Sequence, residues 1–314
     1  MKKNDARDLN LSLNPAELKK LYRIQSYKHG AAIAFNWIVI ALTIWLCVTY
    51  FNPFLYILAI IIIGARQHAL AILMHDATHY RFLKNKKWND IMTNVLTTYF
   101  LFTSIEKYRQ NHLRHHRHLN TEDDPDWIAK LGRQEFTFPK TKKEFLITLL
   151  SYFSLYMGVR DAIWIIHRFS VPKGDKKVFH QAENTPLKIT FYVTLAILLT
   201  VLGLWSTFFF YWIIPYFSTF FMFQYIRSVA EHFGDLEYDD LLGSTRTVIK
   251  INPIERFFLA PHNVGYHLEH HLYPAVPFYH LPSLHKQLMA NEPYAENAHL
   301  TSGYIGGLLN ELSR

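Results

Sequence analysis

The stretch GAAIAFNWIVIALTIWLCVTYFNPFLYILAIIIIGA, residues 30–65, contains no Asp, Glu, Lys or Arg. Its 36 residues are too many for one membrane span, which needs about 20 apolar residues, and close to the number that two spans need. The Asn-Pro pair at 52–53 favours a turn near the middle of this run. We therefore predict a helical hairpin with spans near 31–51 and 54–74.

A second charge-free run covers residues 189–226, and its 38 residues again suit two spans. The glycine-containing stretch at 203–209 is the expected break, which predicts spans near 187–205 and 208–227. The sequence thus predicts an all-α integral membrane protein with four transmembrane helices in two hairpins. Buried core hairpins in a water-soluble protein are the alternative, and apolar runs of this length disfavour it.

The polar segments at 75–186 and 228–314 are predicted to form one cytosolic helical cap, so that residues 1–314 make a single domain. An even number of spans separates these segments, and both therefore emerge on the same face of the membrane. Basic residues mark that face as cytoplasmic. The first 30 residues carry seven Lys/Arg against three acids, and Tyr80–Glu144 carries 13 against eight. Both termini are accordingly predicted to be cytoplasmic.

The formal charge of +8 suits a protein that lies against anionic lipid headgroups. The chain shows no recognised nucleic-acid-binding motif, so nucleic acid is not an expected partner. The single cysteine, Cys47, allows neither an intramolecular disulfide nor a thiolate metal site.

Histidines gather in three clusters of the predicted cap. HDATH (75–79) places two histidines four residues apart, whereas NHLRHH (111–116) and YHLEHH (266–271) each place three at i, i+3 and i+4. Such positions share one helix face, and the adjacent pair diverges, so each triplet suits two metal ions better than one. Neutral imidazole binds Zn, Cu, Fe and Ni well. The predicted metal ligands are His75, His79, His112, His115, His116, His232, His267, His270 and His271.

Acid and amide side chains beside these histidines are expected to orient them, because a ligating imidazole normally donates its other N–H to such a group. The candidates are Asp76, Asn111, Glu231, Asn263 and Glu269. A histidine-rich metal-buffering surface is the alternative interpretation of the clusters. The isolated His29 is expected to be an ordinary residue. The acidic stretch TEDDPDW (121–127) is predicted to be a solvated loop, and a metal site formed by its acids is the less favoured alternative.

Arg66 and His68 fall inside the second predicted span, where ionisable groups usually face the protein interior. One interpretation places them along a substrate channel; interhelical hydrogen bonding or a shorter span is the interpretation we favour. The apolar segments 145–159 and 91–102 are too short to span comfortably and are expected to lie along the interface or under the cap.

The histidine pattern resembles that of the membrane fatty acid desaturase family, which carries an HxxxH or HxxxxH box, an HxxHH box and a late HxxHH or QxxHH box. Here the boxes are HDATH (75–79), HLRHH (112–116) and HLEHH (267–271). A further histidine, His232, follows the second hairpin within RSVAEHFG. The resemblance in order, spacing and topology covers about residues 35–285.

This resemblance implies a four-span protein whose cytosolic cap holds two iron ions on these histidines, with no catalytic residues beyond the metal ligands. It implies the use of dioxygen and two electrons to remove hydrogens from the alkyl or acyl chain of a fatty acid or lipid. Zinc lacks the redox chemistry for that reaction. The protein would position the chain and keep water away from the reacting atoms.

The chain contains no HPGG haem-binding stretch, no cysteine set for an iron–sulfur cluster and no GxGxxG fingerprint. We therefore expect a separate electron donor, either a ferredoxin or a b-type cytochrome, which docks on the basic cytosolic surface.

Two alternative functions remain open. A hydroxylase or ketolase of a lipid or carotenoid carries similar boxes, and its outcome depends on how the substrate carbon lies relative to the oxidant. A histidine-rich membrane metal transporter or sensor is the other alternative. It predicts ionisable residues through the spans, and the second hairpin carries no Asp, Glu, Lys, Arg or His between residues 189 and 226.

Overall fold

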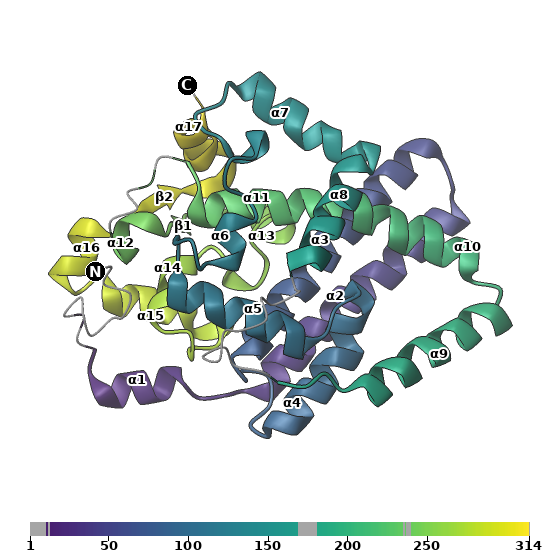
Figure 1. Cartoon of the computed structure of the whole chain (residues 1–314), viewed down its shortest axis with the longest axis horizontal. Helices are drawn as coiled ribbons and strands as arrows, with labels where there is room; N and C mark the ends of the chain where they lie inside the picture. The colour runs from purple at the N-terminus through teal and green to yellow at the C-terminus, as the bar shows by residue number, and fades with distance from the viewer. Residues whose placement is uncertain (1–10, 12, 169–180, 235, 237–239, 314) are drawn as a thin grey trace.

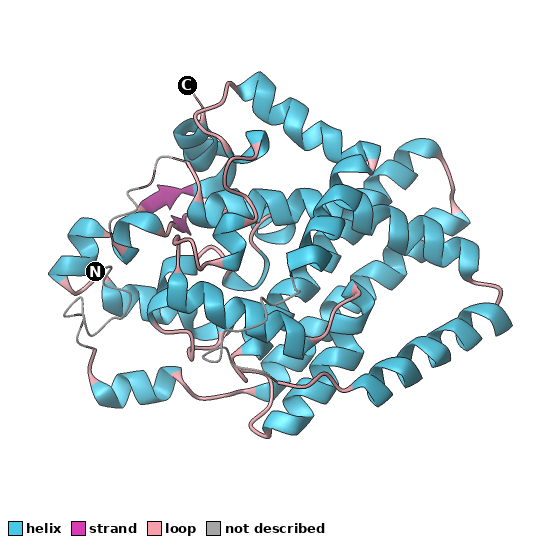
Figure 2. Cartoon of the chain, in the orientation of Figure 1, coloured by secondary structure: helices cyan, strands magenta, loops and turns pink. Residues whose placement is uncertain are grey.

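A computed structural model describes residues 11, 13–168, 181–234, 236 and 240–313, and helices make up most of them (Figures 1 and 2). Two short strands are the exception among the described residues. Strand β1 (Thr247–Ile249) pairs in parallel with β2 (Leu300–Ser302), with Thr247 opposite Leu300. This pairing joins the two ends of the carboxyl-terminal part of the cap.

The first predicted hairpin is present as α2 (Ser26–Thr49) and α3 (Pro53–Thr78). Asn52 begins α3 by accepting a hydrogen bond from Leu55 N at 2.9 Å, and Pro53 occupies the first helical position, where its missing N–H costs nothing. Both helices are long and apolar enough to cross a membrane. Helix α3 continues four residues beyond the predicted end of the span and carries the first histidine box out of it.

The second hairpin differs in detail from the prediction. Helix α9 (Thr185–Val201) has 17 residues, the lower limit for a span, and the chain turns at Gly203, where φ is +65°. The following helical run, Trp205–His232, is 28 residues long and apolar enough to cross a membrane. It comprises α10 (Trp205–Phe208), η5 (Phe209–Ile213), η6 (Tyr216–Phe220) and α11 (Phe221–His232).

Within the described residues, three helices therefore meet the requirements of a span individually. A fourth candidate is the pair 142–154 and 156–165, which meets them only jointly and is bent by 82°. This pair comprises α7 (Lys142–Ser151), η4 (Tyr152–Ser154) and α8 (Tyr156–Arg168). Leu146, Ile147 and Leu150 on α7 are exposed, as expected for an interfacial segment. The four-span arrangement itself stays a prediction.

The rest of the described chain forms the cap and its connections. Between the hairpins lie α4 (Lys86–Thr93), η1 (Asn94–Thr98), η2 (Tyr99–Leu101), α5 (Ile105–His118), α6 (Pro125–Ile128) and η3 (Gln134–Phe136). Helix α1 (Pro15–Leu21) precedes the first hairpin. After the second come α12 (Leu241–Ser244), α13 (Pro253–Phe258), η7 (Pro261–Asn263), α14 (His267–Leu272), η8 (Phe278–His280), α15 (Leu281–Leu288), α16 (Glu292–Asn297), η9 (Gly303–Leu308) and α17 (Leu309–Leu312).

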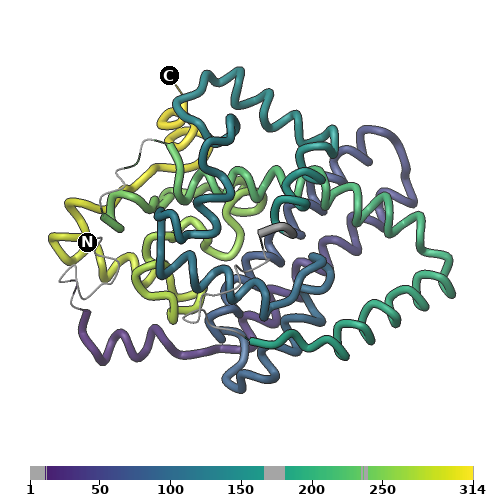
Figure 3. The backbone as a smooth tube through the Cα atoms, in the orientation of Figure 1, coloured from purple at the N-terminus to yellow at the C-terminus, as the bar shows by residue number. Residues whose placement is uncertain are grey.

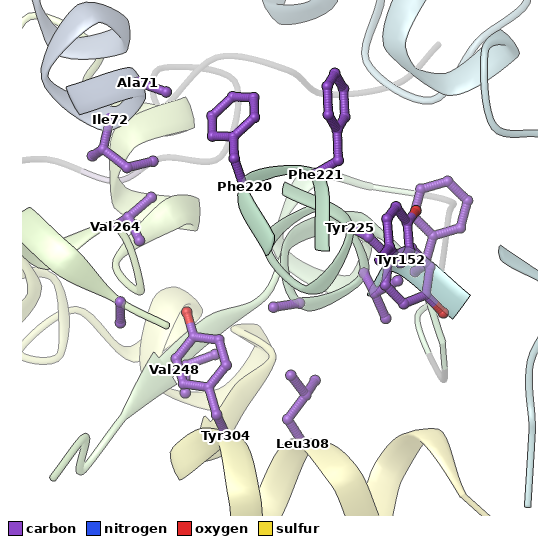
Figure 4. Close-up of a cluster of buried hydrophobic side chains, with 14 of the residues drawn as sticks. Ala71, Ile72, Tyr152, Phe220, Phe221, Tyr225, Val248, Val264, Tyr304 and Leu308 are labelled. Atoms are coloured by element: carbon purple, nitrogen blue, oxygen red, sulfur yellow. The ribbon is translucent and has the colours of Figure 1, made fainter. Parts of the chain in front are cut away.

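A continuous hydrophobic cluster joins the long helices to the cap (Figure 4). Ala71 and Ile72 from α3 and Phe220 and Phe221 from the second hairpin contribute to it, and so do Val248, Val264, Tyr304 and Leu308 from the cap. The backbone trace shows the slate-blue α3 and the green α11 in this region (Figure 3), and the two helices contact each other. Shared burial of apolar surface therefore holds the two hairpins and the cap in one arrangement.

Gly64 allows α3 and η6 to approach closely. A Cβ atom added at Gly64 would lie 2.0 Å from Thr219 Oγ1 and 2.7 Å from Phe220 N. Gly64→Ala is expected to destabilise the protein by about 1–3 kcal/mol, because the two helices must separate. Thermal unfolding in detergent measures the effect. Gly30→Ala is the matched control, since no atom lies within 4 Å of its added Cβ; equal midpoints for the two variants would contradict this packing.

Candidate metal centre

The nine predicted ligands come together from five places in the fold. His75 lies in the last turn of α3 and His79 directly follows this helix. Helix α5 carries His112, His115 and His116, α11 ends at His232, and α14 carries His267, His270 and His271. Figure 1 shows α5, α11 and α14 around the end of α3. Four helices, from the long α3 to the six-residue α14, therefore bring the histidine clusters to one buried region.

The first group contains His75, His112, His116 and His270, whose candidate ligand atoms all lie within 4.8 Å of one another. His116 Nε2 is 3.0 Å from His112 Nε2 and 3.1 Å from His270 Nε2. His79 joins them, because its Nε2 lies 2.9 Å from His112 Nε2. Five imidazoles thus surround one common point, the focus of this group.

The second group contains His115, His232, His267 and His271, again with candidate ligand atoms within 4.8 Å of one another. His267 Nε2 lies 2.9 Å from His232 Nε2 and 3.0 Å from His271 Nε2. Adjacent residues in the chain therefore belong to different groups: His115 separates from His116, and His270 from His271. The groups are neighbours, since the rings of His116 and His271 stack with centroids 4.3 Å apart.

These separations fit metal ligation. Two nitrogens at right angles on one ion, each about 2.1 Å from it, are about 3.0 Å apart. His75 Nε2 is buried without a hydrogen-bond partner among the described residues, although rings of the same group surround it. A cation at the focus would satisfy such an atom, whereas an empty cluster would leave it unpaired.

Protonation states agree with this interpretation. Burial, reinforced by neighbouring positive groups, lowers the pKa of most cap imidazoles well below its ordinary value, which keeps them neutral and able to bind metal. This holds for His112, His116, His267, His270 and His271, and the pKa of His79 falls to about 3. His115 differs: burial opposes its charge, but the Asp124 carboxylate outweighs burial and raises the pKa of His115.

Of the five predicted orienting side chains, Glu231 contacts an imidazole of the two groups. Its Oε1 lies 3.3 Å from His267 Nδ1, and Arg227 Nε donates to the same oxygen at 2.6 Å. Both side chains are buried. Arg227 therefore fixes Glu231, and Glu231 fixes the ring of His267.

The other four point to different parts of the cap. Asp76 accepts from Phe278 N at 3.0 Å and lies 3.3 Å from His29 Nδ1, so His29 is a buried partner of Asp76 instead of an incidental residue. Glu269 accepts from Thr247, Tyr294 and His285. The amide of Asn111 donates to Asp126, and that of Asn263 donates to the Phe278 carbonyl. These residues hold the segments that carry the histidines.

Asp124 was missed by the sequence analysis, which assigned it to a solvated loop. The side chain is fully buried, and its two carboxylate oxygens lie 3.0 and 3.1 Å from His115 Nδ1. It also begins α6 by accepting from Asp126 N at 2.9 Å. The Asp-Pro pair at 124–125 was the available signal, because Asp before Pro is typical of a helix N-cap.

A cavity of about 430 Å³ opens beside the imidazoles, within the usual size range of small-molecule sites. His112, His115, His232 and His267 line one end of it. Aromatic side chains of the second hairpin, Tyr216, Phe217, Phe220 and Phe221, line the wall. Charged side chains, among them Lys107, Arg133, Asp161 and Lys188, also line it. An apolar chain with a polar end group therefore fits this cavity.

Arg66 and His68 do not belong to the described cavity lining. Arg66 is buried between helices, where it donates to Asn36 Oδ1 at 3.2 Å and to the Phe257 carbonyl, and its guanidinium lies 3.8 Å above the Phe257 ring. His68 is buried and stacks on Phe223. Arg66 therefore ties α2 and α13 to α3.

A helical protein with apolar spans, paired imidazole groups and an adjoining apolar cavity belongs to the class of membrane metalloproteins that act on lipid-like molecules. Residues 51–303 match the family model described as fatty acid desaturase, and the chain belongs to this family. The resemblance stated from the histidine boxes is thereby confirmed. Membership identifies the chain as an oxidoreductase and supports desaturation of a lipid chain.

Curated relatives span several members of the family. The chain is 31% identical to dihydrorhizobitoxine desaturase of Bradyrhizobium elkanii over 81% of its own length and 72% of the relative's. It is 24% identical to beta-carotene ketolase of Paracoccus sp. (strain PC1), with 82% and 90% covered. It is 25% identical to the omega-3 fatty acid desaturase fat-1 of Caenorhabditis elegans, with 74% and 60% covered.

Proposed function

We propose that this protein desaturates an alkyl or acyl chain of a fatty acid or lipid, using dioxygen and two electrons at a di-iron centre. The observation that carries this proposal is the pair of buried imidazole groups at the end of an apolar cavity. Family membership supports the reaction class. The nature of the metal, the electron donor and the substrate are the parts proposed here.

Each imidazole group would hold one iron ion: His75, His79, His112, His116 and His270 the first, and His115, His232, His267 and His271 the second. Bound iron supplies the redox chemistry that reduces dioxygen and removes hydrogen from an unactivated chain. Zinc is compatible with imidazole ligands but has no redox chemistry, so it does not explain the reaction.

The chain's own side chains position the substrate and exclude water. Ala71 and Met74 on α3 and Phe220 and Phe221 on the second hairpin surround the cavity near the imidazoles. Their apolar surfaces favour an alkyl segment over water at this end. The reacting carbons would thereby be held next to the imidazole groups. Holding them in the correct orientation makes them far more reactive than the carbons of a freely diffusing chain.

We place the metal centre, the cap (75–186 and 228–314) and both termini on the cytoplasmic side, with all four spans in one domain of residues 1–314. In this arrangement α9 serves as the third span despite its length. The basic residues of the amino terminus and of the segment between the hairpins support this orientation.

Electrons are proposed to come from a separate ferredoxin or b-type cytochrome that docks on the basic cap. Opposite charges speed such encounters, and salt screens them. Turnover with a matched acidic donor is therefore expected to slow as ionic strength rises, with the change in donor KM larger than that in kcat. Steady-state rates across a salt series measure this. Rates that stay constant across the series would contradict electrostatic docking.

Oxygen insertion is the second candidate function. Relatives include the beta-carotene ketolase and a human sphingolipid delta(4)-desaturase/C4-monooxygenase, which is 26% identical to this chain over 230 residues. The position of the substrate carbon relative to the metal pair decides between the two outcomes. Mass spectrometry of the product distinguishes them, since desaturation removes two hydrogens and hydroxylation adds one oxygen.

Heterologous expression with lipid and metabolite profiling tests the proposal as a whole. Cells that express the protein are expected to accumulate a product lacking two hydrogens, and purified protein is expected to contain about two irons per chain. A variable load of zinc without any oxidised product would favour the metal transporter or sensor and reject the enzyme.

A further inference from the structure

Three tyrosines line the described part of the cavity, and their hydroxyl groups differ in their hydrogen-bond partners. Tyr216 donates to the Leu101 carbonyl at 3.0 Å, and Tyr225 donates to the Glu135 carbonyl at 2.7 Å. Both hydrogens are thereby directed to the backbone. Tyr108 has no acceptor of this kind among the described residues.

Tyr108 lies at the metal end of the cavity. It is one helical turn before His112 on α5, and its ring stacks on that imidazole with centroids 5.6 Å apart and planes 13° apart. The ring also meets the edge of His75, with centroids 6.5 Å apart. Packing against two candidate ligands leaves the phenol little freedom to turn away.

Arg227 limits the role that the hydroxyl can take. Its guanidinium neighbours Tyr108, while its Nε donates to Glu231 at 2.6 Å. A guanidinium carries only donors, so the Tyr108 oxygen can only act as an acceptor toward it. The hydroxyl hydrogen is then free to donate, and the cavity is the space that Tyr108 lines.

We propose that Tyr108 is a catalytic residue that donates a hydrogen bond to dioxygen at the metal end of the cavity. This inference rests on the proposed function. An alkyl segment offers no acceptor at that position, whereas dioxygen is the co-substrate that does. The neighbouring positive charge of Arg227 polarises the phenol and strengthens it as a donor.

Tyr108→Phe tests the inference, since it removes the hydroxyl and keeps the ring that packs on His112. Nitric oxide, which binds ferrous iron in place of dioxygen, is the probe. The variant is expected to keep the wild-type iron content and to bind nitric oxide about fivefold more weakly, the effect of one hydrogen bond. The fraction of consumed dioxygen that yields product is expected to fall, with substrate KM unchanged.

Tyr99→Phe is the matched control. Tyr99 is fully buried outside the described cavity lining, and its hydroxyl faces the Asn184 carbonyl at 3.5 Å. This control is expected to match wild type in iron content, nitric oxide affinity and coupling.

Two results would overturn the assignment of Tyr108. Wild-type nitric oxide affinity and coupling in Tyr108→Phe would show that the hydroxyl touches no reacting group, and loss of iron would show that the residue only supports His112. Either result leaves the proposed function intact when wild-type protein holds iron and forms product. Wild-type protein that holds no iron would instead reject the proposed function itself.

Discussion

His270→Ala is expected to abolish activity and to remove iron from the five-histidine group. His270 Nε2 lies 3.1 Å from His116 Nε2, and the His270 ring is within 4.9 Å of that of His79. Alanine removes one of the five imidazoles of the group and leaves a buried polar space in its place. Loss of an outer partner of a ligand costs about 10–100-fold, so we expect loss of a ligand to reduce product formation by more than about 100-fold.

Iron content per chain and product formation measure this effect on purified protein. His280→Ala is the matched control, because His280 contacts Gln25 outside both imidazole groups. The control is expected to retain two irons and wild-type rates. If His270→Ala kept both irons and full activity, the assignment of His270 as a ligand would be wrong.

Asp124→Asn is expected to weaken metal binding in the four-histidine group by about 10–100-fold. The carboxylate lies 3.0 Å from His115 Nδ1 and carries the negative charge that favours a strongly electron-donating imidazole. Asparagine keeps a side-chain oxygen that can accept from Asp126 N, so the start of α6 is expected to survive. The affinity change therefore reports on His115 and not on folding.

Iron titration of metal-depleted protein measures the affinity, and thermal unfolding in detergent checks the fold. Asp123→Asn is the matched control, since Asp123 is the exposed neighbour in the same loop. Asp124→Ala also removes the N-cap hydrogen bonds of α6 and should cost about 1 kcal/mol of additional stability. Equal iron affinity in Asp124→Asn and Asp123→Asn would show that Asp124 plays no part in the metal centre.

Local sequence was sufficient to predict the first hairpin and the location of the histidine clusters. A charge-free run around Asn52-Pro53 has few ways to bury its surface, and helical spacing alone places i, i+3 and i+4 on one face. The second hairpin was predicted less well. Its first helix, α9, is shorter than expected, and the helical run that follows begins at Trp205 and includes π-helical turns that no periodicity indicated.

The side chains that orient the imidazoles could not be predicted from the local sequence. Asp76, Glu231 and Glu269 each adjoin a predicted ligand in the chain, yet only Glu231 reaches one in space. A side chain next to a ligand on a helix points about 100° away from it, so its partners come from whichever element packs there. Asp124, nine residues from His115, reaches that ring because the loop after α5 folds back over the helix.

By itself, the amino-acid sequence determined that this protein has long apolar helices and nine clustered imidazoles, because both follow from residue type and from spacing within one helical element. Tertiary structure alone decided the division of those imidazoles into groups of five and four, the burial of Asp124, the interhelical role of Arg66 and the aromatic cavity beside the metal centre. These features depend on atoms from elements far apart in the chain, whose distances are set by the packing of α3, α5, α11 and α14 against one another.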